Sequence, residues 1–382
     1  MDGKLIANRY RLEHRLGSGG MGDVWLAHDS QLDRPVAIKF LALDRLRRHN
    51  GNQINLTEKM TGKFLQEARA MARVSSPYVV TVHDQGEEDD RFHLVMELVD
   101  GRPLTSYMGA GNALTLEQTV RWSAQACEGL ADAHEAEVVH RDIKPDNIMI
   151  TERGDVKLVD FGLARLLDVT VTNGVGLTWL YASPERCLGR PGDHLSDLYS
   201  LGCVLYEMLT GRPPFGSSET APYIIADMHV RNKPSAPQDV RPGIPEELND
   251  LTLRLLAKEP DQRPPDALTV ARLIHQTEYI PDTHGGALVL SGTPHVNPDY
   301  VDRIRGLERH IRKLQMSNGY TDPAVVDARM NLAELTGESG DARGAVALYE
   351  ELGNDCRDDF GPYDRRTLNA YEALARWIAS SA

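Results

Sequence analysis

The chain has 382 residues, which is too long for one ordinary globular domain and suits two or three. Its 42 Lys and Arg residues against 56 Asp and Glu residues give a formal net charge of −14. This acidic excess disfavours a broad surface for nucleic acid or for an anionic membrane, although it leaves room for a local basic site.

The four cysteines lie far apart, without C-x-x-C or zinc-finger spacing, so we expect reduced thiols in an intracellular protein. No apolar run approaches the ~20 residues that a bilayer-spanning helix needs. Residues 1–10 are polar and lack the apolar stretch of a secretory signal. We therefore expect a soluble, cytoplasmic protein that binds neither membrane nor nucleic acid.

Short apolar runs separated by turn signals fill the first hundred residues. One segment among them, Lys63–Val74, instead places apolar residues at helical spacing. This pattern predicts a small antiparallel sheet that carries one helix. The expected strands are Arg11–Leu16, Val24–His28, Val36–Phe40, Val79–Asp84 and Phe92–Val99.

Helical periodicity dominates after Gly101, with breaks rich in Pro and Gly. A larger, helix-dominated unit therefore follows the sheet. Its clearest helices are expected at Leu116–Ala136, Asp197–Leu209 and Glu246–Ala257. Thr277–Pro298 mixes Gly, Pro, Thr and His without periodicity, which is the composition of a linker.

The remaining residues contain a weak internal repeat. Asp322 matches Asp364, 42 positions later, and the apolar positions around Ala328 match those around Ala370 at the same spacing. Stacked helical hairpins repeat in this way. A small helical bundle with a chance match is the alternative explanation.

Residues 17–22, Gly-Ser-Gly-Gly-Met-Gly, fit the pattern G-x-G-x-x-G, which dinucleotide-binding folds and phosphate-cradling hairpins share. In a dinucleotide fold the third glycine opens a helix, but here Val24–Ala27 leads through a turn into Val36–Lys39, and both have strand character. The sequence therefore favours a hairpin lid whose bare backbone approaches phosphate oxygens. A plain structural hairpin is the alternative unless a phosphate-binding lysine accompanies it.

Lys39 is that candidate lysine, since it lies mid-strand among apolar residues, where a cation is costly to bury unless it is paired. Its carboxylate partner is expected from the following helix. Glu67 lies three positions after Phe64 and four before Met71, on the apolar stripe of that helix. We therefore predict a Lys39–Glu67 ion pair, although a lone helix glutamate is more often a solvated surface charge.

Two further motifs follow in the helical part of the chain. His140–Asn147 reads His-Arg-Asp-Ile-Lys-Pro-Asp-Asn, and Asp160–Gly162 reads Asp-Phe-Gly. Each by itself could be a polar loop or a turn. Their order, downstream of the glycine loop and Lys39, argues against a chance combination.

Residues from about Tyr10 to His275, roughly two-thirds of the chain, resemble a protein kinase, and the glycine lid resembles that of bacterial eukaryotic-type Ser/Thr kinases. The resemblance implies an α+β fold of two lobes, and the internal repeat adds an all-α helical-repeat module after the linker. The implied boundaries are 1–9 for an N-terminal extension, 10–99 for a β-rich N-lobe, 100–275 for a helical C-lobe, 276–300 for a linker and 301–382 for the repeat module.

The resemblance assigns a role to each motif residue. Asp142 corresponds to the catalytic aspartate that accepts the substrate hydroxyl proton, and Lys144 contacts the transferring phosphate in the Ser/Thr-directed form of the motif. Lys39 holds the phosphates of ATP, and Glu67 orients Lys39. The implied Mg²⁺ ligands are Asn147 and Asp160.

The implied nucleotide site combines the glycine lid with apolar residues that enclose adenine. Met96 is the implied gatekeeper, and Glu97 and Val99 belong to the implied hinge. The lid consists of Gly17, Ser18, Gly19, Gly20, Met21 and Gly22. The residues expected against adenine are Leu16, Val24, Ala37 and Met149, all of which are also ordinary core residues.

Regulation is implied by Arg141, because an arginine before the catalytic aspartate binds a phosphate on the activation segment in such kinases. Thr170 and Thr172 are candidate acceptors for autophosphorylation, which a homodimer would allow, but either could equally be an inert loop residue. Thr178 resembles the substrate-site threonine that hydrogen-bonds Asp142 and Lys144.

Structural roles are implied for an ion pair between Glu185 and Arg263 and for Asp197 as an anchor of the catalytic loop. Two departures from the family pattern accompany them. The spacing from the lysine to the helix glutamate is long, with the excess in Arg47–Thr61, and Leu177 stands where the family has glycine. Neither departure removes a catalytic group.

The C-terminal module resembles tetratricopeptide repeats of the longer kind and would bind a protein partner or substrate. The predicted function is that of a Mg²⁺- and ATP-dependent Ser/Thr protein kinase. One rival is a pseudokinase scaffold that binds nucleotide without turnover, and the complete set of motif residues argues against it. A small-molecule kinase is the second rival, which the Thr178–Glu185 segment and Arg263 disfavour because that segment forms the peptide platform.

Overall fold

The computed structural model describes residues 3–19, 22–41, 62, 65–88, 91–108, 113–161, 179–217, 220–277, 303, 304, 306, 307, 310, 311, 314, 322–339, 342–361 and 363–381. The chain divides into two compact units. One comprises Lys4–Leu12 with Leu16–Thr283, and the other is built mainly from His284–Ala382.

A six-stranded sheet forms the N-lobe of the first unit. Its order is β1-β2-β3-β4-β6-β5, and the pairs β1–β2, β3–β4, β4–β6 and β5–β6 are antiparallel. β1 uses residues that the sequence assigned to an N-terminal extension. The strands are β1 (Leu5–Ile6), β2 (Tyr10–Gly19), β3 (Gly22–Asp29), β4 (Arg34–Leu41), β5 (Val82–Glu88) and β6 (Arg91–Glu97).

β4 is buried on both faces, which explains its nearly continuous apolar sequence. Val36, Ile38 and Phe40 pack on one face in a cluster with Ile6 of β1. Because side chains alternate along a strand, Lys39 lies on the opposite face with Ala37. Residues 65–71 are helical, as the sequence predicted for this part of the lobe, and Ala68 and Met71 are buried.

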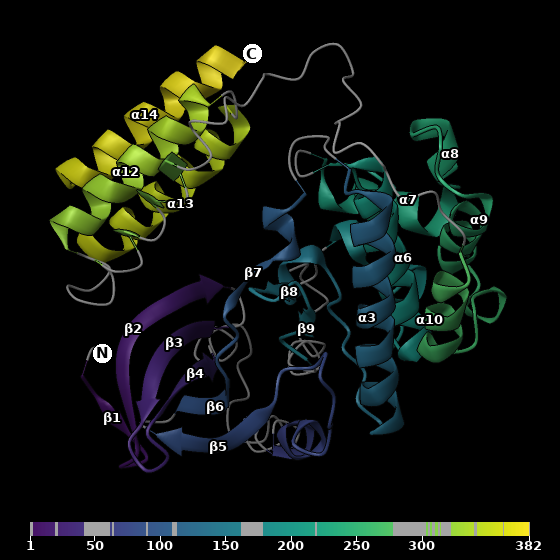
Figure 1. Ribbon diagram of the computed structural model, residues 1–382, viewed down its shortest axis with the longest axis horizontal. Coiled ribbons are helices and arrows are strands. Elements are labelled where there is room, and N and C mark those ends of the chain that lie inside the picture. The colour runs from purple at the N-terminus through teal and green to yellow at the C-terminus, as the bar shows by residue number, and fades with distance from the viewer. Residues whose placement is uncertain are drawn as a thin grey trace. The chain divides into compact units, whose positions relative to one another are not determined.

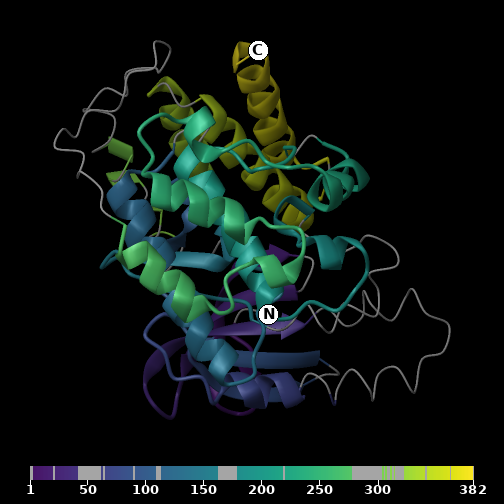
Figure 2. The ribbon, with the colours of Figure 1, turned by 90° about the vertical axis from the view of Figure 1, so that its right-hand side faces the viewer.

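Helices build the C-lobe, and Figures 1 and 2 show them at one end of this unit and the purple strands at the other. The helices are α3 (Leu116–Glu135), α5 (Pro184–Cys187), α6 (His194–Thr210), α7 (Pro222–Arg231), α8 (Pro237–Val240), α9 (Glu246–Leu255) and α10 (Ala267–His275). Short 3₁₀ turns lie at Leu104–Ser106, Pro145–Asn147, Trp179–Tyr181 and Pro260–Gln262. The three helices expected from periodicity agree with α3, α6 and α9.

α6 is the central helix of the C-lobe, because nearly all of its residues are buried. It begins at Asp193, whose side chain accepts hydrogen bonds from the backbone of Leu195 and Ser196, and it ends at Gly211 with a φ of 75°. Gly202 allows α9 to approach closely, since a Cβ at that position would lie 2.7 Å from the Cβ of Leu255.

A small second sheet joins the two lobes. Its order is β7 (Gly101–Pro103), β8 (Ile148–Thr151) and β9 (Val156–Leu158), and both pairs are antiparallel. Val80 donates a backbone hydrogen bond to Leu158, so the N-lobe is tied directly to this sheet. The segment before β8 and the segment after β9 are therefore held at the junction of the lobes.

The second unit contains α12 (Pro323–Glu338), α13 (Ala342–Phe360) and α14 (Arg365–Ser381). α12 and α14 begin 42 positions apart, at 323 and 365, and each follows a capping aspartate, Asp322 or Asp364. Gly337 of α12 lets the ring of Trp377 in α14 approach, because a Cβ there would lie 2.3 Å from that ring.

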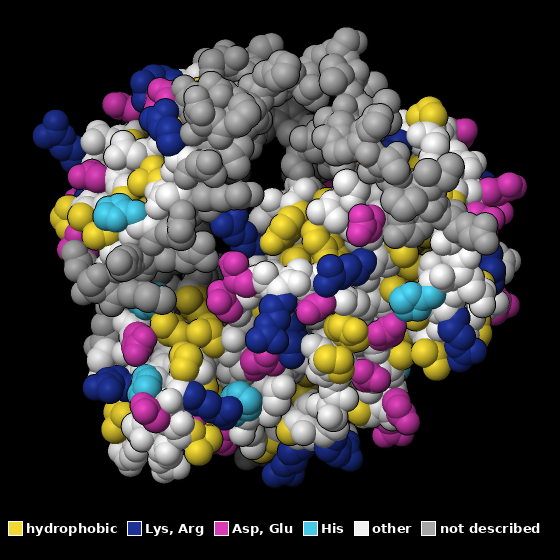
Figure 3. Space-filling model, in the orientation of Figure 1, with side chains coloured by type: hydrophobic (Ala, Val, Ile, Leu, Met, Phe, Trp, Pro, Cys, Tyr) yellow, Lys and Arg dark blue, Asp and Glu magenta, His cyan; other side chains and the backbone are white. Residues whose placement is uncertain are grey.

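Charged side chains of both signs are interspersed among apolar ones on the face shown in Figure 3, outside the grey atoms. Among the described residues, no helix is both long and apolar enough to span a bilayer.

Candidate active site

The segment His140–Asn147, here called the catalytic loop, connects α3 to β8 and is fixed by one buried carboxylate. Asp197 of α6 accepts hydrogen bonds from the backbone N–H of His140 at 2.8 Å and of Arg141 at 2.7 Å. His134 Nε2 lies 2.9 Å from the same carboxylate. Burial alone would raise the pKa of Asp197, but hydrogen bonding and charge from His134 outweigh it and lower the pKa. The ionised carboxylate therefore anchors the loop, as the sequence predicted.

Asp197 stabilises an unfavourable backbone conformation at Arg141. Arg141 has a φ of 65°, a left-handed value that is uncommon for residues other than glycine. Such a conformation costs about 1–3 kcal/mol and persists only where surrounding contacts impose it. The hydrogen bond from the Arg141 N–H to Asp197 is one such contact. It fixes the residue directly before Asp142.

Asp142 contacts two polar side chains of its own loop. Lys144 Nζ lies 2.9 Å from Asp142 Oδ2. Asn147 Nδ2 donates to the same oxygen at 3.0 Å and to the Asp142 carbonyl at 2.7 Å. Asp142 is buried, so these contacts orient the carboxylate in a region of reduced dielectric. The structure thus brings together three residues that the sequence assigned to catalysis.

The β8–β9 hairpin brings Asp160 to the same loop. Asn147 directly precedes β8, and the Val159 N–H, just after β9, donates to the Asn147 carbonyl at 3.0 Å. His140 Nε2 lies 2.9 Å from the Val159 carbonyl, and the ring of Phe161 lies 4.3 Å from the His140 ring. Burial lowers the pKa of His140, so the ring is neutral and donates from Nε2 to that carbonyl.

Lys39 pairs with Asp160 in this structure. Its Nζ lies 2.8 Å from Asp160 Oδ2, and the lysine is 3% exposed. A buried cation requires such a partner, which is the reason the sequence singled out this lysine. The lysine predicted to hold phosphates and the aspartate of the Asp-Phe-Gly motif are therefore adjacent.

Glu67 has a different ion-pair partner from the one predicted. Its Oε1 lies 3.7 Å from Arg141 Nη1, and Lys39 pairs with Asp160 instead. Lys39 and Glu67 both lie at the junction of the lobes, as predicted. The predicted ion pair between these two described residues is absent from the structure. Two carboxylates and two cations meet here, and the sequence could not decide which of them pair.

Two of the four apolar residues assigned to adenine, Val24 and Ala37, lie in one cluster with the predicted gatekeeper and a predicted hinge residue. Val24, Ala37, Met96 and Val99 pack together with Val80, Leu98 and Val159. The last three were missed from the sequence; Val159 could have been found from its place before Asp160. Leu16 is 41% exposed at the edge of the sheet, and Met149 lies in β8. The hinge residue Glu97 is held by Lys157, whose Nζ lies 2.9 Å from its carboxylate.

The glycine lid joins β2 to β3, the hairpin that the sequence favoured over a strand–helix turn. β2 reaches Gly19, and β3 begins at Gly22 with a φ of 137°, a value that L side chains rarely adopt. Gly20 and Met21 lie outside the described residues, as do the side-chain environments of Ser18 and Gly19. A Cβ at Gly17 would meet no atom within 4 Å, so this part of the lid is open.

A family model described as the protein kinase domain matches residues 10–280. The chain belongs to the protein kinase family. The kinase domain is 38% identical to a probable serine/threonine-protein kinase of Clostridium perfringens over 266 residues, and 40% identical to one of Streptomyces coelicolor over 269 residues. It is 37% identical to the serine/threonine-protein kinase PrkC of Bacillus subtilis over 264 residues.

These matches cover 68–69% of this chain but only 37–39% of the relatives, so the chain spans well under half of their length. Among solved structures, the kinase domain of Mycobacterium tuberculosis PknI aligns with a TM-score of 0.56 and 24% sequence identity. That alignment covers 72% of this chain and 98% of the solved one. It supports the two-lobed fold.

Membership in the family implies ATP with a divalent metal. In the part of the chain that the structure describes, no three His, Cys, Asp or Glu residues are grouped to hold a metal by themselves. A divalent cation such as Mg²⁺ is held in proteins by one or two carboxylates together with substrate phosphates. The Asn147 amide donates its nitrogen to Asp142, which leaves its carbonyl oxygen as the acceptor, and Asp160 offers carboxylate oxygen. This pair of hard oxygen donors fits the metal.

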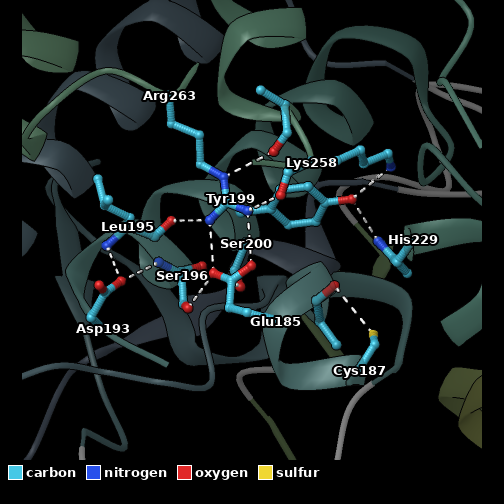
Figure 4. A network of polar contacts seen from close by, with 12 residues as sticks. Glu185, Cys187, Asp193, Leu195, Ser196, Tyr199, Ser200, His229, Lys258 and Arg263 are labelled. Atoms are coloured by element: carbon cyan, nitrogen blue, oxygen red, sulfur yellow. Dashed lines mark hydrogen bonds and ion pairs between the residues drawn. The ribbon is translucent and has the colours of Figure 1, made fainter. Parts of the chain in front are cut away.

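The expected Glu185–Arg263 pair is present in the C-lobe of the kinase domain (Figure 4). Two guanidinium nitrogens donate to the two carboxylate oxygens at 2.8 and 2.9 Å, and Ser196 donates to the same carboxylate at 2.5 Å. The remaining guanidinium hydrogens bind backbone carbonyls of Leu195, Ala257 and Lys258. This network joins the end of the activation segment to α6 and to the turn before α10.

Several expected features lie outside the described residues. They are the candidate phosphoacceptors Thr170 and Thr172, the substrate-site residues Leu177 and Thr178, Gly162, and the Arg47–Thr61 loop. Their roles therefore remain sequence predictions.

Proposed function

We propose that this chain transfers the terminal phosphoryl group of ATP to Ser or Thr hydroxyls of proteins, with Mg²⁺ as its metal. The observation that carries the proposal is the joint placement of Asp142, Lys144 and Asn147. These residues share hydrogen bonds, and the backbone bond between Asn147 and Val159 places the segment that carries Asp160 beside them. The names of the bacterial relatives support the Ser/Thr class.

Phosphoryl transfer needs positioning and charge compensation more than covalent chemistry. Lys39 is buried in β4 opposite Val24 of β3, the strand that follows the glycine lid, which suits its ammonium group to hold phosphate oxygens. Its pairing with Asp160 keeps this positive charge in place before a nucleotide enters. The overall charge of −14 does not oppose ATP binding, because the field at the site is local.

Asp142 is placed to receive the proton of the substrate hydroxyl as the oxygen attacks the phosphorus. Lys144 lies 2.9 Å from the Asp142 carboxylate, so its ammonium can compensate charge on the phosphoryl group as it passes. When bound, Mg²⁺ would neutralise the phosphate oxygens, and Asn147 and Asp160 would hold it.

The pseudokinase alternative is not favoured, because Lys39, Asp142, Asn147 and Asp160 are all present in the sequence. A scaffold that only bound nucleotide would have no need for a buried, hydrogen-bonded Asp142 with Lys144 at its side. Autophosphorylation at Thr170 or Thr172 through a homodimer, and a cytoplasmic location, belong to the same proposal.

The C-terminal unit is proposed to recruit a protein partner or substrate. Its support is the 42-residue spacing between α12 and α14, each of which starts at a capping aspartate. Helical repeats present extended surfaces to other proteins. Deleting residues 302–382 should leave basal transfer and impair partner capture.

The proposed function is tested by incubating the full chain with labelled ATP, Mg²⁺ and myelin basic protein. The wild-type chain should label itself or the added protein, and Lys39→Met should abolish labelling. Lys233→Met removes an exposed lysine of the C-lobe and serves as the matched control, with activity equal to wild type. Equal labelling by the wild-type and Lys39→Met proteins would refute the assignment of the site.

A further inference from the structure

The Trp179–Tyr181 turn begins the segment that leads from the activation segment to Glu185, and α6 holds one end of it. Ser200 Oγ donates to the Tyr181 carbonyl at 2.7 Å, and the Tyr181 hydroxyl donates to Glu207 at 2.7 Å. Both contacts act on Tyr181. The Trp179 carbonyl accepts from the Ala182 N–H at 3.2 Å, and neither of the two side-chain contacts involves the Leu180 carbonyl.

Tyr199, His229 and Lys258 form a polar cluster from three segments of the C-lobe (Figure 4), and α7, which carries His229, packs against the Trp179–Tyr181 turn. His229 of α7 is 0% exposed, and its Nδ1 lies 2.9 Å from the hydroxyl of Tyr199 in α6. Lys258 donates to the same hydroxyl at 3.3 Å, and its Nζ lies 4.3 Å from the centroid of the Phe215 ring. We call these four residues the His229 cluster.

The hydrogen-bonding capacities in the cluster fix the proton positions. The ammonium of Lys258 can only donate, so the Tyr199 oxygen accepts from it. Burial raises the pKa of Tyr199 far above its ordinary value, so Tyr199 keeps its proton. The remaining acceptor within reach of that proton is Nδ1 of His229. A neutral His229 then carries its own proton on Nε2.

His229 is neutral at physiological pH. Burial and the charge of Lys258 lower its pKa to about 3, against the smaller opposing effect of the Leu180 and Trp179 carbonyls. Among the described residues, Nε2 is buried and has no partner with hydrogen-bond geometry. A buried N–H without an acceptor is destabilising. The Leu180 and Trp179 carbonyls influence the pKa of His229, and neither has hydrogen-bond geometry to this N–H.

We propose that His229 is a positioning residue that binds a backbone carbonyl of the Trp179–Tyr181 turn through Nε2–H when protein substrate docks. The inference rests on the proposed kinase activity, since it names a residue that sets the affinity for the phosphate acceptor. Tyr199 and Lys258 select the tautomer that presents this N–H. α7 thereby acts on the peptide platform without touching ATP.

The kinetic test compares the Michaelis constants of full-length variants for myelin basic protein and for ATP. His229→Phe keeps an aromatic ring but loses both nitrogens, and it should raise KM for the protein substrate roughly 3- to 10-fold, as expected for one neutral hydrogen bond. KM for ATP should be unchanged. His229→Gln offers an acceptor to Tyr199 and a donor to the turn, so it should restore most of the loss.

Tyr199→Phe frees Nδ1 and should raise KM for the protein substrate by a smaller factor, because His229 can then adopt either tautomer. His275→Phe, an exposed histidine of α10, is the matched control and should behave as wild type. Unchanged KM for the protein substrate in folded His229→Phe would overturn the proposal. Equal losses for both substrates without rescue by His229→Gln would overturn it as well, because they indicate a structural role.

The nitrogen chemical shifts of His229, measured by NMR on the full chain, test the arrangement independently of catalysis. The proposal predicts the Nε2–H tautomer in the wild type and a mixture in Tyr199→Phe. An Nδ1–H tautomer in the wild type would overturn the proposal even if the kinase is active. If the wild type transfers no phosphate, the proposed function is wrong. The measured tautomer of His229 then still tests whether the Nε2–H is available to the turn.

Discussion

Two sets of carboxylates in the kinase domain differ in how completely the fold engages them. Asp197 and Glu185 are buried in the C-lobe, where backbone N–H groups or a bidentate arginine occupy their oxygens. Asp160 and Glu67 lie at the junction of the lobes, where Asp160 pairs with Lys39 and Glu67 pairs with Arg141. The first set stabilises the fold, and we propose that the partners of the second set exchange when nucleotide binds.

The largest expected loss of stability comes from breaking the Glu185–Arg263 ion pair. Arg263→Leu leaves the Glu185 carboxylate buried and unpaired, so it should lower the free energy of unfolding of the kinase domain by roughly 3–5 kcal/mol. Urea denaturation measures this loss. The double variant Glu185→Gln with Arg263→Leu removes the charge and should recover part of it; no recovery would mean that the charge is not the cause.

The pH dependence of stability tests the Glu185–Arg263 pair in a second way. Burial alone would raise the pKa of Glu185, but hydrogen bonds from Arg263 and Ser196 outweigh it and lower the pKa below its ordinary value of 4.5. The pair therefore stabilises the fold above pH ~4.5, and this contribution is lost as the pH falls through the folded pKa. Arg263→Leu should show a weaker loss of stability over that interval. Identical pH profiles for wild type and variant would contradict this assignment.

A smaller effect is expected from weakening the anchor of the catalytic loop. Asp197→Asn replaces one acceptor oxygen by an amide, so one loop N–H loses its partner, at a cost of about 1–3 kcal/mol. kcat should fall more than KM for ATP changes, since the loop carries Asp142 but does not contact adenine. Asp193→Asn on the same helix keeps a good N-cap and should change neither quantity.

Substitutions at the junction of the lobes should affect catalysis more than stability. Glu67→Gln keeps the shape of the side chain and weakens an ion pair with Arg141 whose nearest atoms lie 3.7 Å apart, so it should change the free energy of unfolding by less than about 1 kcal/mol. kcat should nevertheless fall if Glu67 orients Lys39 during catalysis. A loss of stability as large as that of Asp197→Asn would show that Glu67 belongs to the fixed set.

In the C-terminal unit, substitutions are expected to affect the stability of that unit and not catalysis. Asp322→Ala removes the N-cap of α12 and should cost about 1 kcal/mol in the unfolding of that unit. Asp364→Ala should act in the same direction on α14, where hydrogen bonds from Arg366 lower the pKa of Asp364 to about 2. Basal kinase activity should not change, and a change in either variant would contradict the separation of the two units.

The sequence predicted contiguous features of the fold and the site well. The hairpin lid and the catalytic loop follow from motifs whose residues lie close together, whereas the Glu185–Arg263 pair, 78 positions apart, was implied only by the family resemblance. Asp142, Lys144 and Asn147 meet because they share one loop of eight residues. Helix periodicity likewise placed α3, α6 and α9 within a few residues of their observed ends.

Contacts between separate elements could not be predicted in the same way. Lys39, Glu67, Arg141 and Asp160 come from four segments, and several pairings satisfy their charges equally. The His229 cluster was missed because Tyr199, His229 and Lys258 lie in three segments without a shared motif. The strand β1 was missed because two residues, Leu5 and Ile6, are too few to show an alternating pattern.

The central claim is that Asp142 and its neighbours transfer phosphate to Ser or Thr. Mass-spectrometric mapping of the full chain after incubation with ATP and Mg²⁺ tests it most directly, with Asp142→Asn treated in parallel. Phosphoserine or phosphothreonine in the wild type, and none in Asp142→Asn, is the predicted result. Equal phosphorylation of both proteins, or none in the wild type under any condition tried, would contradict the claim.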